Sequence, residues 1–363
     1  MSNSPTVYIP MDRRQAMARG ESLPDRTEGA ALFADISGFT PLTEALAQEL
    51  GARRGAEELT KYLNIIYDGL IEEVYRYHGS VIGFSGDAIT CWLDGDDGLR
   101  AAACALSMQQ TMQHFSSVRS PSGLTFPLDI KVAVAAGSAR RFRVGDPQIQ
   151  YWDVLAGATL DRLAEAEHEA ERGEVVVSAE VAVRSNPDLR VGQWREGEEP
   201  GSRFAVVTGL NSKVEDHPWP ILPGDALPEE MVRPWILPAN YERVISGQDK
   251  FQAELRPAVA LFLRFGGIDY DRDGAAGEKL DAYVRWVQGT IAHYNGSLLQ
   301  VTIGDKGSYL YVAFGAPVAH EDDAARAILA AMQLHELPPD LNFIHSVQIG
   351  ISKGGTSHFR VKT

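Results

Sequence analysis

The sequence predicts an α+β fold in which two β-α-α-β-β-α-β units follow each other, each with an antiparallel-rich sheet covered by helices on one face. The first observation is an internal repeat, because the second half of the 363-residue chain matches the first. The second is that each copy alternates short apolar runs, typical of buried strands, with long amphipathic stretches, typical of helices. The third is a Gly-Asp turn between two apolar runs in each copy, which indicates a β-hairpin.

Each copy opens with a buried strand and a long helix. ALFADISG at 31–38 lines up with ALFLRFGG at 260–267, and both are apolar runs that lead into a glycine turn. The amphipathic stretches that follow, 41–78 and 278–295, carry Leu, Ile, Tyr and Val at helical spacing. Both stretches end at a Gly-Ser pair, after which the hairpin begins.

The hairpin, a second helix and a last strand complete each copy. The hairpins read VIGFSGDAITCWL and LLQVTIGDKGSYLYVAF, so Asp87 corresponds to Asp305. Alanine-rich stretches at 98–114 and 320–335 predict the next helix. The strand KVAVAAGSARRFRV then matches VQIGISKGGTSHFRV at an offset of 217 residues.

The first copy continues where the second has no counterpart. A strand near 150–154, a helix at 158–171 and strands near 174–178 and 203–207 are predicted after the shared part. We therefore expect the second domain to be incomplete at its C-terminal end. The expected organisation is an N-terminal arm, a first domain, a proline-rich semi-rigid linker and a second domain, at 1–28, 29–208, 209–256 and 257–363.

Composition narrows the class of protein. The chain carries 34 Lys and Arg against 49 Asp and Glu, a formal net charge of −15, and this opposes binding to nucleic acid or to an anionic membrane. No run approaches the ~20 apolar residues of a membrane span and no apolar export signal opens the chain, so we expect a cytoplasmic protein. Cys91 and Cys104 are too few for a disulfide framework and should be reduced core residues.

Two aspartates stand where strands of the first copy end. Asp35 closes the first buried strand and Asp87 lies in the hairpin turn, so adjacent antiparallel strands should bring both carboxylates to one sheet edge. Paired carboxylates beside backbone carbonyl and amide groups are what Mg²⁺ ions on a triphosphate require. Each residue alone could instead be a turn aspartate or a helix cap. The order of strand, DISGFT, helix, Gly-Ser and GFSGDA favours metal binding.

Through ALFADISGFTPLTEAL and VIGFSGDAITCWL the chain resembles the class III nucleotide cyclases, above all the soluble-type adenylyl cyclases and their bacterial relatives. The resemblance covers about 28–208 and, more weakly, 257–361. It implies two ferredoxin-like cyclase homology domains in tandem. It also implies that Asp35, Asp87 and the carbonyl of Ile36 hold two Mg²⁺ or Mn²⁺ ions.

The resemblance places the nucleotide at the glycine turn after the first strand. Glycine turns at helix N-termini hold phosphate through unpaired N–H groups and the helix dipole, so the physical argument agrees. The residues that it assigns to the triphosphate are Ser37, Gly38, Phe39, Thr40 and Gly86.

A lysine completes the expected charge pattern of the first copy. Lys131 lies six residues before Gly137, where the family has a basic residue that contacts the triphosphate. The alternative is a lysine that protects a strand edge from aggregation. Gln348 replaces Lys131 in the second copy and Arg264 replaces Asp35, so we expect the second copy to bind no pair of metal ions.

The second copy is expected to recognise the base. Gln300 occupies the position of the family's adenine-reading lysine, and its amide can pair with adenine or, after a flip, with guanine. Val301 would take that position if one residue were inserted between the copies. The family's transition-state Asn and Arg have acidic counterparts in the first copy, Asp161 and Glu165, so a second active site there should be degenerate.

Other candidates have simpler explanations. Bicarbonate control, known in soluble-type cyclases, has weak support because Gly83 replaces one basic residue and Arg162 matches the other only after a shift. His78 is expected to be a surface or capping residue. The charge run at 165–172 is expected to be a solvated helix face.

The resemblance implies a nucleotide cyclase that converts ATP to 3′,5′-cyclic AMP and pyrophosphate by two-metal catalysis, at the interface of a pseudo-dimer within the chain. ATP is the expected partner and GTP the alternative, which would make the protein a guanylate cyclase. Further C-terminal regulatory domains are expected in a longer protein. The competing hypothesis is a catalytically weak nucleotide-binding module of a larger signalling ATPase.

Overall fold

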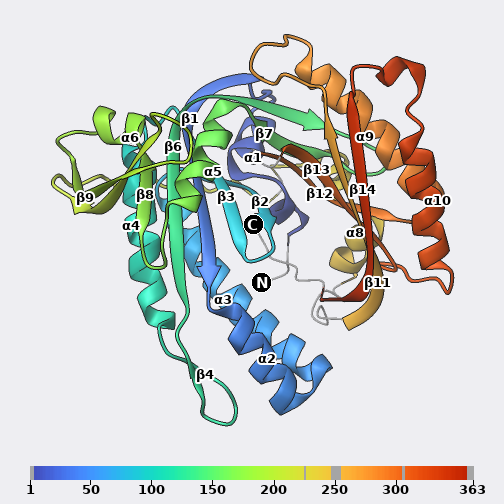
Figure 1. Ribbon diagram of the computed structural model, residues 1–363, viewed down its shortest axis with the longest axis horizontal. Helices are drawn as coiled ribbons and strands as arrows, with labels where there is room; N and C mark the ends of the chain where they lie inside the picture. Colours follow the sequence, from blue (N-terminus) through green and yellow to red (C-terminus); the bar gives the residue numbers. More distant parts are fainter. Residues whose placement is uncertain (1–3, 225, 247–254, 305–306, 358–363) are drawn as a thin grey trace. The chain divides into compact units, whose positions relative to one another are not determined.

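The computed structural model describes residues 4–224, 226–246, 255–304 and 307–357 (Figure 1). These residues form two compact units. The N-terminal unit comprises Pro10–Ala139 and Gly157–Pro223, and the C-terminal unit comprises Arg140–Ala156 with the described parts of Met1–Ile9 and Gly224–His358. One strand, β6 (Asp129–Val144), begins in the first unit and ends in the second.

The N-terminal unit is built on a mixed sheet in the order β2-β3-β1-β6-β8-β10-β9. Four of its strand pairs, β1·β3, β2·β3, β8·β10 and β9·β10, are antiparallel, and β6·β8 is parallel. The antiparallel-rich α+β fold is therefore confirmed. Besides β6, the strands are β1 (Arg26–Ser37), β2 (Ser80–Ser85), β3 (Ala88–Asp94), β8 (Val175–Ser178), β9 (Leu189–Glu196) and β10 (Arg203–Leu210).

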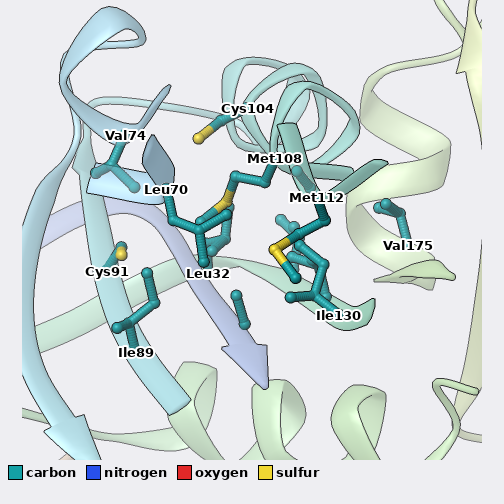
Figure 2. Close-up of a cluster of buried hydrophobic side chains, with 14 of the residues drawn as sticks. Leu32, Leu70, Val74, Ile89, Cys91, Cys104, Met108, Met112, Ile130 and Val175 are labelled. Carbon is teal, nitrogen blue, oxygen red and sulfur yellow. The ribbon is translucent and has the colours of Figure 1, made fainter. Parts of the chain in front are cut away.

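Three helices cover one face of this sheet: α2 (Phe39–Leu50), α3 (Ala52–Arg76) and α4 (Leu99–Met112). Their apolar side chains meet alternate residues of the strands, and Figure 2 shows Leu32, Leu70, Met108 and Ile130 in this core. Both cysteines are buried there as free thiols, as expected, and burial raises the pKa of each.

The predicted long helix at 41–78 is two helices in the structure. Gly51 has φ +79°, which is not a helical conformation, and it separates α2 from α3. Glycine suits this position because residues with a side chain rarely adopt such a φ. Gly55 then lets α3 approach α2 closely, since a Cβ there would lie 2.7 Å from the carbonyl oxygen of Leu46. The helical periodicity was correct, but it does not reveal the break.

The opposite face of the sheet carries α5 (Ala158–His168), which packs on β1 and β8. Ala34 and Ile36 point into the α2–α4 core, so Asp35 between them faces the α5 side. By the same alternation, Lys131 of β6 faces that side, since Ile130 and Val132 belong to the core.

Shorter elements complete the N-terminal unit. The segment expected as an N-terminal arm contains α1 (Met11–Ala18), whose residues 12–16 are all buried. The remaining elements are η2 (Gln113–Phe115), β4 (Val118–Arg119), β5 (Thr125–Phe126) and α6 (Ala179–Arg184).

The C-terminal unit has a four-stranded, fully antiparallel sheet in the order β12-β13-β11-β14. It repeats the β2-β3-β1-β6 part of the first sheet, which confirms the tandem repeat. The segment expected as a linker contains short helices. The elements are η1 (Pro5–Tyr8), β7 (Trp152–Ala156), α7 (Glu229–Val232), η3 (Arg233–Trp235), α8 (Pro238–Ile245), β11 (Leu255–Gly266), α9 (Ala276–His293), β12 (Ser297–Gly304), β13 (Gly307–Phe314), α10 (Asp323–His335), η5 (Pro339–Leu341) and β14 (Ser346–Ser357).

Residues of the first copy belong to the core of this unit. The end of β6 pairs with β7, and Phe142, Val144 and Val154 from this hairpin pack with α9 and β11 side chains. None of the helices that the structure describes is both long and apolar enough for a membrane span.

Candidate active site

Asp35 and Asp87 lie at the same end of the N-terminal sheet. Asp35 is the strand partner of Ala88, the residue after Asp87, and the N–H of Ile36 donates to the Asp87 carbonyl at 3.2 Å. Burial raises the pKa of Asp35 first, and the negative charge of Asp87 raises it further. The two carboxylates therefore repel each other, and a cation between them would relieve this repulsion.

A buried tyrosine supports the turn that carries Asp87. Tyr67 of α3 donates from its hydroxyl to the Gly86 carbonyl at 3.4 Å, and its ring meets Phe84 edge-on at 5.4 Å between centroids. Burial, followed by the charges of Asp87 and Asp35, raises the pKa of Tyr67. The phenol therefore stays neutral and holds the turn; the sequence analysis did not single it out.

Lys131 reaches the Asp35 carboxylate from β6. Its Nζ lies 3.8 Å from Asp35 Oδ2, and this attraction opposes the rise in the pKa of Asp35. Its closer contact is with Glu167 Oε1 of α5. Three of the expected residues, Asp35, Asp87 and Lys131, are thus together in one unit.

Glu167 corrects one prediction. The run 165–172 was expected to be a solvated helix face, but the Glu167 side chain is only 21% exposed and pairs with Lys131. A signal was present in the sequence, because Leu160, Leu163 and Ala166 mark the buried side of α5 and Glu167 is next to it.

The glycine turn after β1 is shaped for close approach. Gly38 has φ +98° and stands before the first residue of α2, and a Cβ there would lie 2.6 Å from the Pro127 carbonyl oxygen. Gly38 has no side chain with which to cap α2, so the N–H groups of Phe39 and Thr40 donate to no side chain of their N-cap residue. Arg172 donates to the same Pro127 carbonyl and adds positive charge near the turn.

Ser37 ends β1 and Gly86 forms the hairpin turn with φ +65°. Both therefore lie at the same sheet end as Asp35. The turn at Gly86 is open, since a Cβ there would meet no atom within 4 Å.

Gln300 belongs to the other unit. It lies in β12, where its Nε2 donates to Thr302 Oγ1 at 2.9 Å. The strand register shifts between Leu298 and Gln300, as it does between Val81 and Gly83 in β2. The two bulges match at the offset of 217 residues, so no insertion precedes Gln300 and it, rather than Val301, takes the position of Gly83.

The second copy has a cation where the first has Asp35. Arg264 pairs with Tyr309 on one side and Gln348 on the other, and its Nε lies 3.2 Å from where a Cβ of Gly307 would be. The guanidinium thus lies near the β12–β13 turn. Asp305, the expected counterpart of Asp87, lies outside the described residues.

Arg162 of α5 is held inside its own unit. Its Nη2 donates to Thr159 Oγ1 at 3.0 Å and to the Ala136 carbonyl at 3.4 Å. Gly137 allows this approach, since a Cβ there would lie 2.7 Å from Arg162 Nη2. On the same helix, burial raises the pKa of Glu165, and Asp161 is exposed, so α5 presents acids beside this arginine.

No protein-family model matches the chain. It is 23% identical over 385 residues to adenylate cyclase type 10 of Homo sapiens, which covers 96% of this chain and 24% of that protein. It is 23% identical over 360 residues to adenylate cyclase type 10 of Oryctolagus cuniculus, over 91% of this chain and 22% of that protein. The chain thus spans about a quarter of the length of these relatives. Adenylate cyclase 1 of Rhizobium meliloti is 31% identical over 104 residues, 27% of this chain and 14% of that protein.

Solved structures resemble the chain in part. The guanylyl cyclase Cya2 has a TM-score of 0.43 at 22% identity, over 51% of this chain and 94% of that one. The adenylyl cyclase CyaB from P. aeruginosa has a TM-score of 0.40 at 21% identity, over 50% of this chain and 94% of that one.

Proposed function

From the chain's similarity to adenylate cyclases over more than nine-tenths of its length, which makes it class III cyclase-like, we propose that it is a nucleotide cyclase. The proposed reaction converts ATP to 3′,5′-cyclic AMP and pyrophosphate. The ribose 3′-oxygen attacks the α-phosphorus, its proton passes to solvent water, and the bond to the bridging oxygen breaks, so that pyrophosphate leaves with the electron pair. The observation that carries the proposal is the meeting of Asp35, Asp87 and Lys131 at one sheet end.

The donor set suits Mg²⁺ or Mn²⁺. Asp35 and Asp87 repel each other, so a bound cation would stabilise the pair. Mg²⁺ and Mn²⁺ both prefer oxygen ligands, and the two carboxylates with the Ile36 carbonyl would hold the metal ions. When bound, the two ions would lower the pKa of the ribose 3′-hydroxyl and neutralise phosphate charge. No cluster of three or more His, Cys, Asp or Glu side chains suited to a metal occurs in the part of the chain that the structure describes. The proposed ligand set therefore needs the backbone carbonyl of Ile36 in addition to the two carboxylates.

The remaining groups bind the triphosphate. The N–H groups of Ser37 to Thr40 and the Thr40 hydroxyl donate to phosphate oxygens, with the α2 dipole favouring their charge. Lys131 neutralises charge that develops on the leaving pyrophosphate. Gln300 is proposed to read the base, and because its amide can pair with adenine or guanine, GTP stays the alternative substrate.

A second candidate is a nucleotide-binding regulatory module with little turnover. Arg264 favours it, since the second copy has a cation at the metal-ligand position and so supplies no second metal site. The acids Asp161 and Glu165 on α5 stand where the resemblance implies transition-state donors, so a second active site built there should be degenerate.

The deciding experiment measures binding and turnover on the same preparation. The chain is incubated with Mn²⁺ and either ATP or GTP, cyclic nucleotide is measured by mass spectrometry, and binding is measured by calorimetry with Asp87→Asn as the matched control. Cyclic product that is lost in Asp87→Asn supports the cyclase. Binding without product supports the regulatory module, and absence of both refutes the proposed site.

A further inference from the structure

Three charged side chains from three elements meet on the α5 face of the N-terminal sheet. Lys131 of β6 contacts Glu167 of α5 directly and stands 3.8 Å from Asp35 of β1. The side chains of Lys131, Glu167 and Asp35 are 22%, 21% and 27% exposed, so each is largely withdrawn from water. One ammonium group thus lies between two carboxylates and favours the one on α5.

This unequal sharing has a consequence for cation binding. An ammonium group in direct contact with Asp35 would compete with a divalent ion for the same carboxylate. Glu167 is the acid that the ammonium contacts instead. Without it, Lys131 would have Asp35 as its remaining described partner, and a side chain with four rotatable bonds can close a gap of 3.8 Å.

We propose that Glu167 is a positioning residue that draws Lys131 away from Asp35 and so keeps the Asp35 carboxylate available to a divalent cation. This inference deepens the proposed function and rests on it. Glu167 itself need not touch the ion or the nucleotide. Its role is exerted through Lys131 and should disappear when Lys131 carries no charge.

A double-mutant cycle tests this role. Mn²⁺ affinity is measured by the loss of the free-ion electron paramagnetic resonance signal, without nucleotide, for the unaltered chain, Glu167→Gln, Lys131→Met and the double variant. We expect Glu167→Gln to weaken Mn²⁺ binding by about three- to tenfold, the size usual for coupled charges. In the Lys131→Met background the same change should have an effect of less than about twofold.

The controls separate positioning from general electrostatics. Glu171→Gln removes the same charge from an exposed position of the same segment and should leave Mn²⁺ affinity within about twofold. If loss of negative charge alone explained the result, Glu167→Gln would weaken binding equally in both backgrounds, and this would overturn the inference. An unaltered chain that binds no Mn²⁺ would overturn the proposed site and the inference together, whereas an additive cycle on a chain that binds would overturn the inference alone.

Discussion

At the scale of single residues, Asp35 is kept in the sheet at an energetic disadvantage. Burial, Asp87 and Glu167 all disfavour its charged form, and Lys131 only partly compensates. Natural proteins retain such unfavourable groups at functional sites, where a ligand removes the penalty. The unfavourable charge of Asp35 agrees with the proposal that this carboxylate binds a divalent ion.

Replacing Asp87 by Asn should weaken Mn²⁺-dependent ATP binding by at least about tenfold, because the proposed metal ligand loses its charge. The turn should persist, since Tyr67 holds it through the Gly86 carbonyl. Calorimetry of Mn²⁺-ATP checks this, with the exposed Glu44→Gln as the control. Unchanged affinity in Asp87→Asn would rule out the metal assignment.

Replacing Asp35 by Asn should stabilise the protein in the absence of metal. A carboxyl group whose folded pKa is raised above the usual 3.8 contributes stability at low pH that is lost as the pH rises through the folded pKa. The variant should therefore melt about 2 °C higher at pH 8, and the gain should shrink as the pH falls towards 4. A lower melting temperature at pH 8 would show that the Lys131 ion pair outweighs the burial and repulsion.

That Asp35 and Asp87 lie close together could be predicted from chain position, because a strand end and the adjoining hairpin turn meet when the apolar residues of both strands are buried. Lys131 was expected beside them from the resemblance alone. Glu167 was missed because it comes from a helix outside the repeat. Periodicity gives the helix, but it does not say which strand residue that helix meets.

At the scale of elements, the segment after β10 is attached to the N-terminal unit by aromatic stacking. The Trp219 ring lies 3.4 Å from the His78 ring, between centroids, and its indole N–H donates to the Gly79 carbonyl at 2.7 Å. The His217 ring also stacks on the His78 ring, 4.5 Å away between centroids, and the backbone N–H of His217 donates to the Arg76 carbonyl at 2.8 Å. His78 was expected at the surface or as a cap, but it also anchors this segment.

Trp219→Ala should release this segment. Loss of one hydrogen bond and one stacked ring pair should increase local opening by about tenfold. Trypsin cleavage after the exposed Lys213 should accelerate by a similar factor, because cleavage follows the open population. Trp194→Ala, which removes a partly exposed indole from β9, is the matched control; equal acceleration in both variants would count against the anchor.

Element prediction was best where a local signal was strong. The hairpins follow from their Gly-Asp turns, and the matching bulges after Val81 and Leu298 confirm the alignment of the copies through that point. The break at Gly51 was missed because a single glycine inside a long amphipathic pattern is often tolerated. The packing of α2 on α3 decides it here, and that contact is not local in sequence.

At the scale of the whole molecule, the predicted class III resemblance and the tandem α+β fold are confirmed, by the similarity to adenylate cyclases and by the two related sheets. The way the chain is shared between the units was not predicted. Arg140–Ala156 belongs to the first copy by sequence and to the C-terminal unit by packing. A repeat reveals which segments are alike, but not which core each apolar side chain joins.

Phe142→Ala should therefore destabilise the C-terminal unit rather than the unit whose repeat contains Phe142. The Phe142 side chain is 5% exposed and packs in the core with α9 and β11. Gly277 leaves room for this ring, since a Cβ there would lie 2.8 Å from it. Removing a buried phenylalanine costs about 3–5 kcal/mol. Hydrogen exchange should accelerate in β11 and β13 and stay slow in β1 and β3.

Phe204→Ala is the reciprocal variant, since Phe204 is 2% exposed in β10 of the N-terminal unit. It should accelerate exchange in β8 and β10 and leave β11 and β13 protected. If Phe142→Ala instead loosened β1 and β3 first, the hairpin of β6 and β7 would not be part of the C-terminal core. If β11 and β13 loosen first, Phe142, Val144 and Val154 are part of the C-terminal core. A fragment that starts at 257 lacks these three residues and should then fold less stably than one that keeps them.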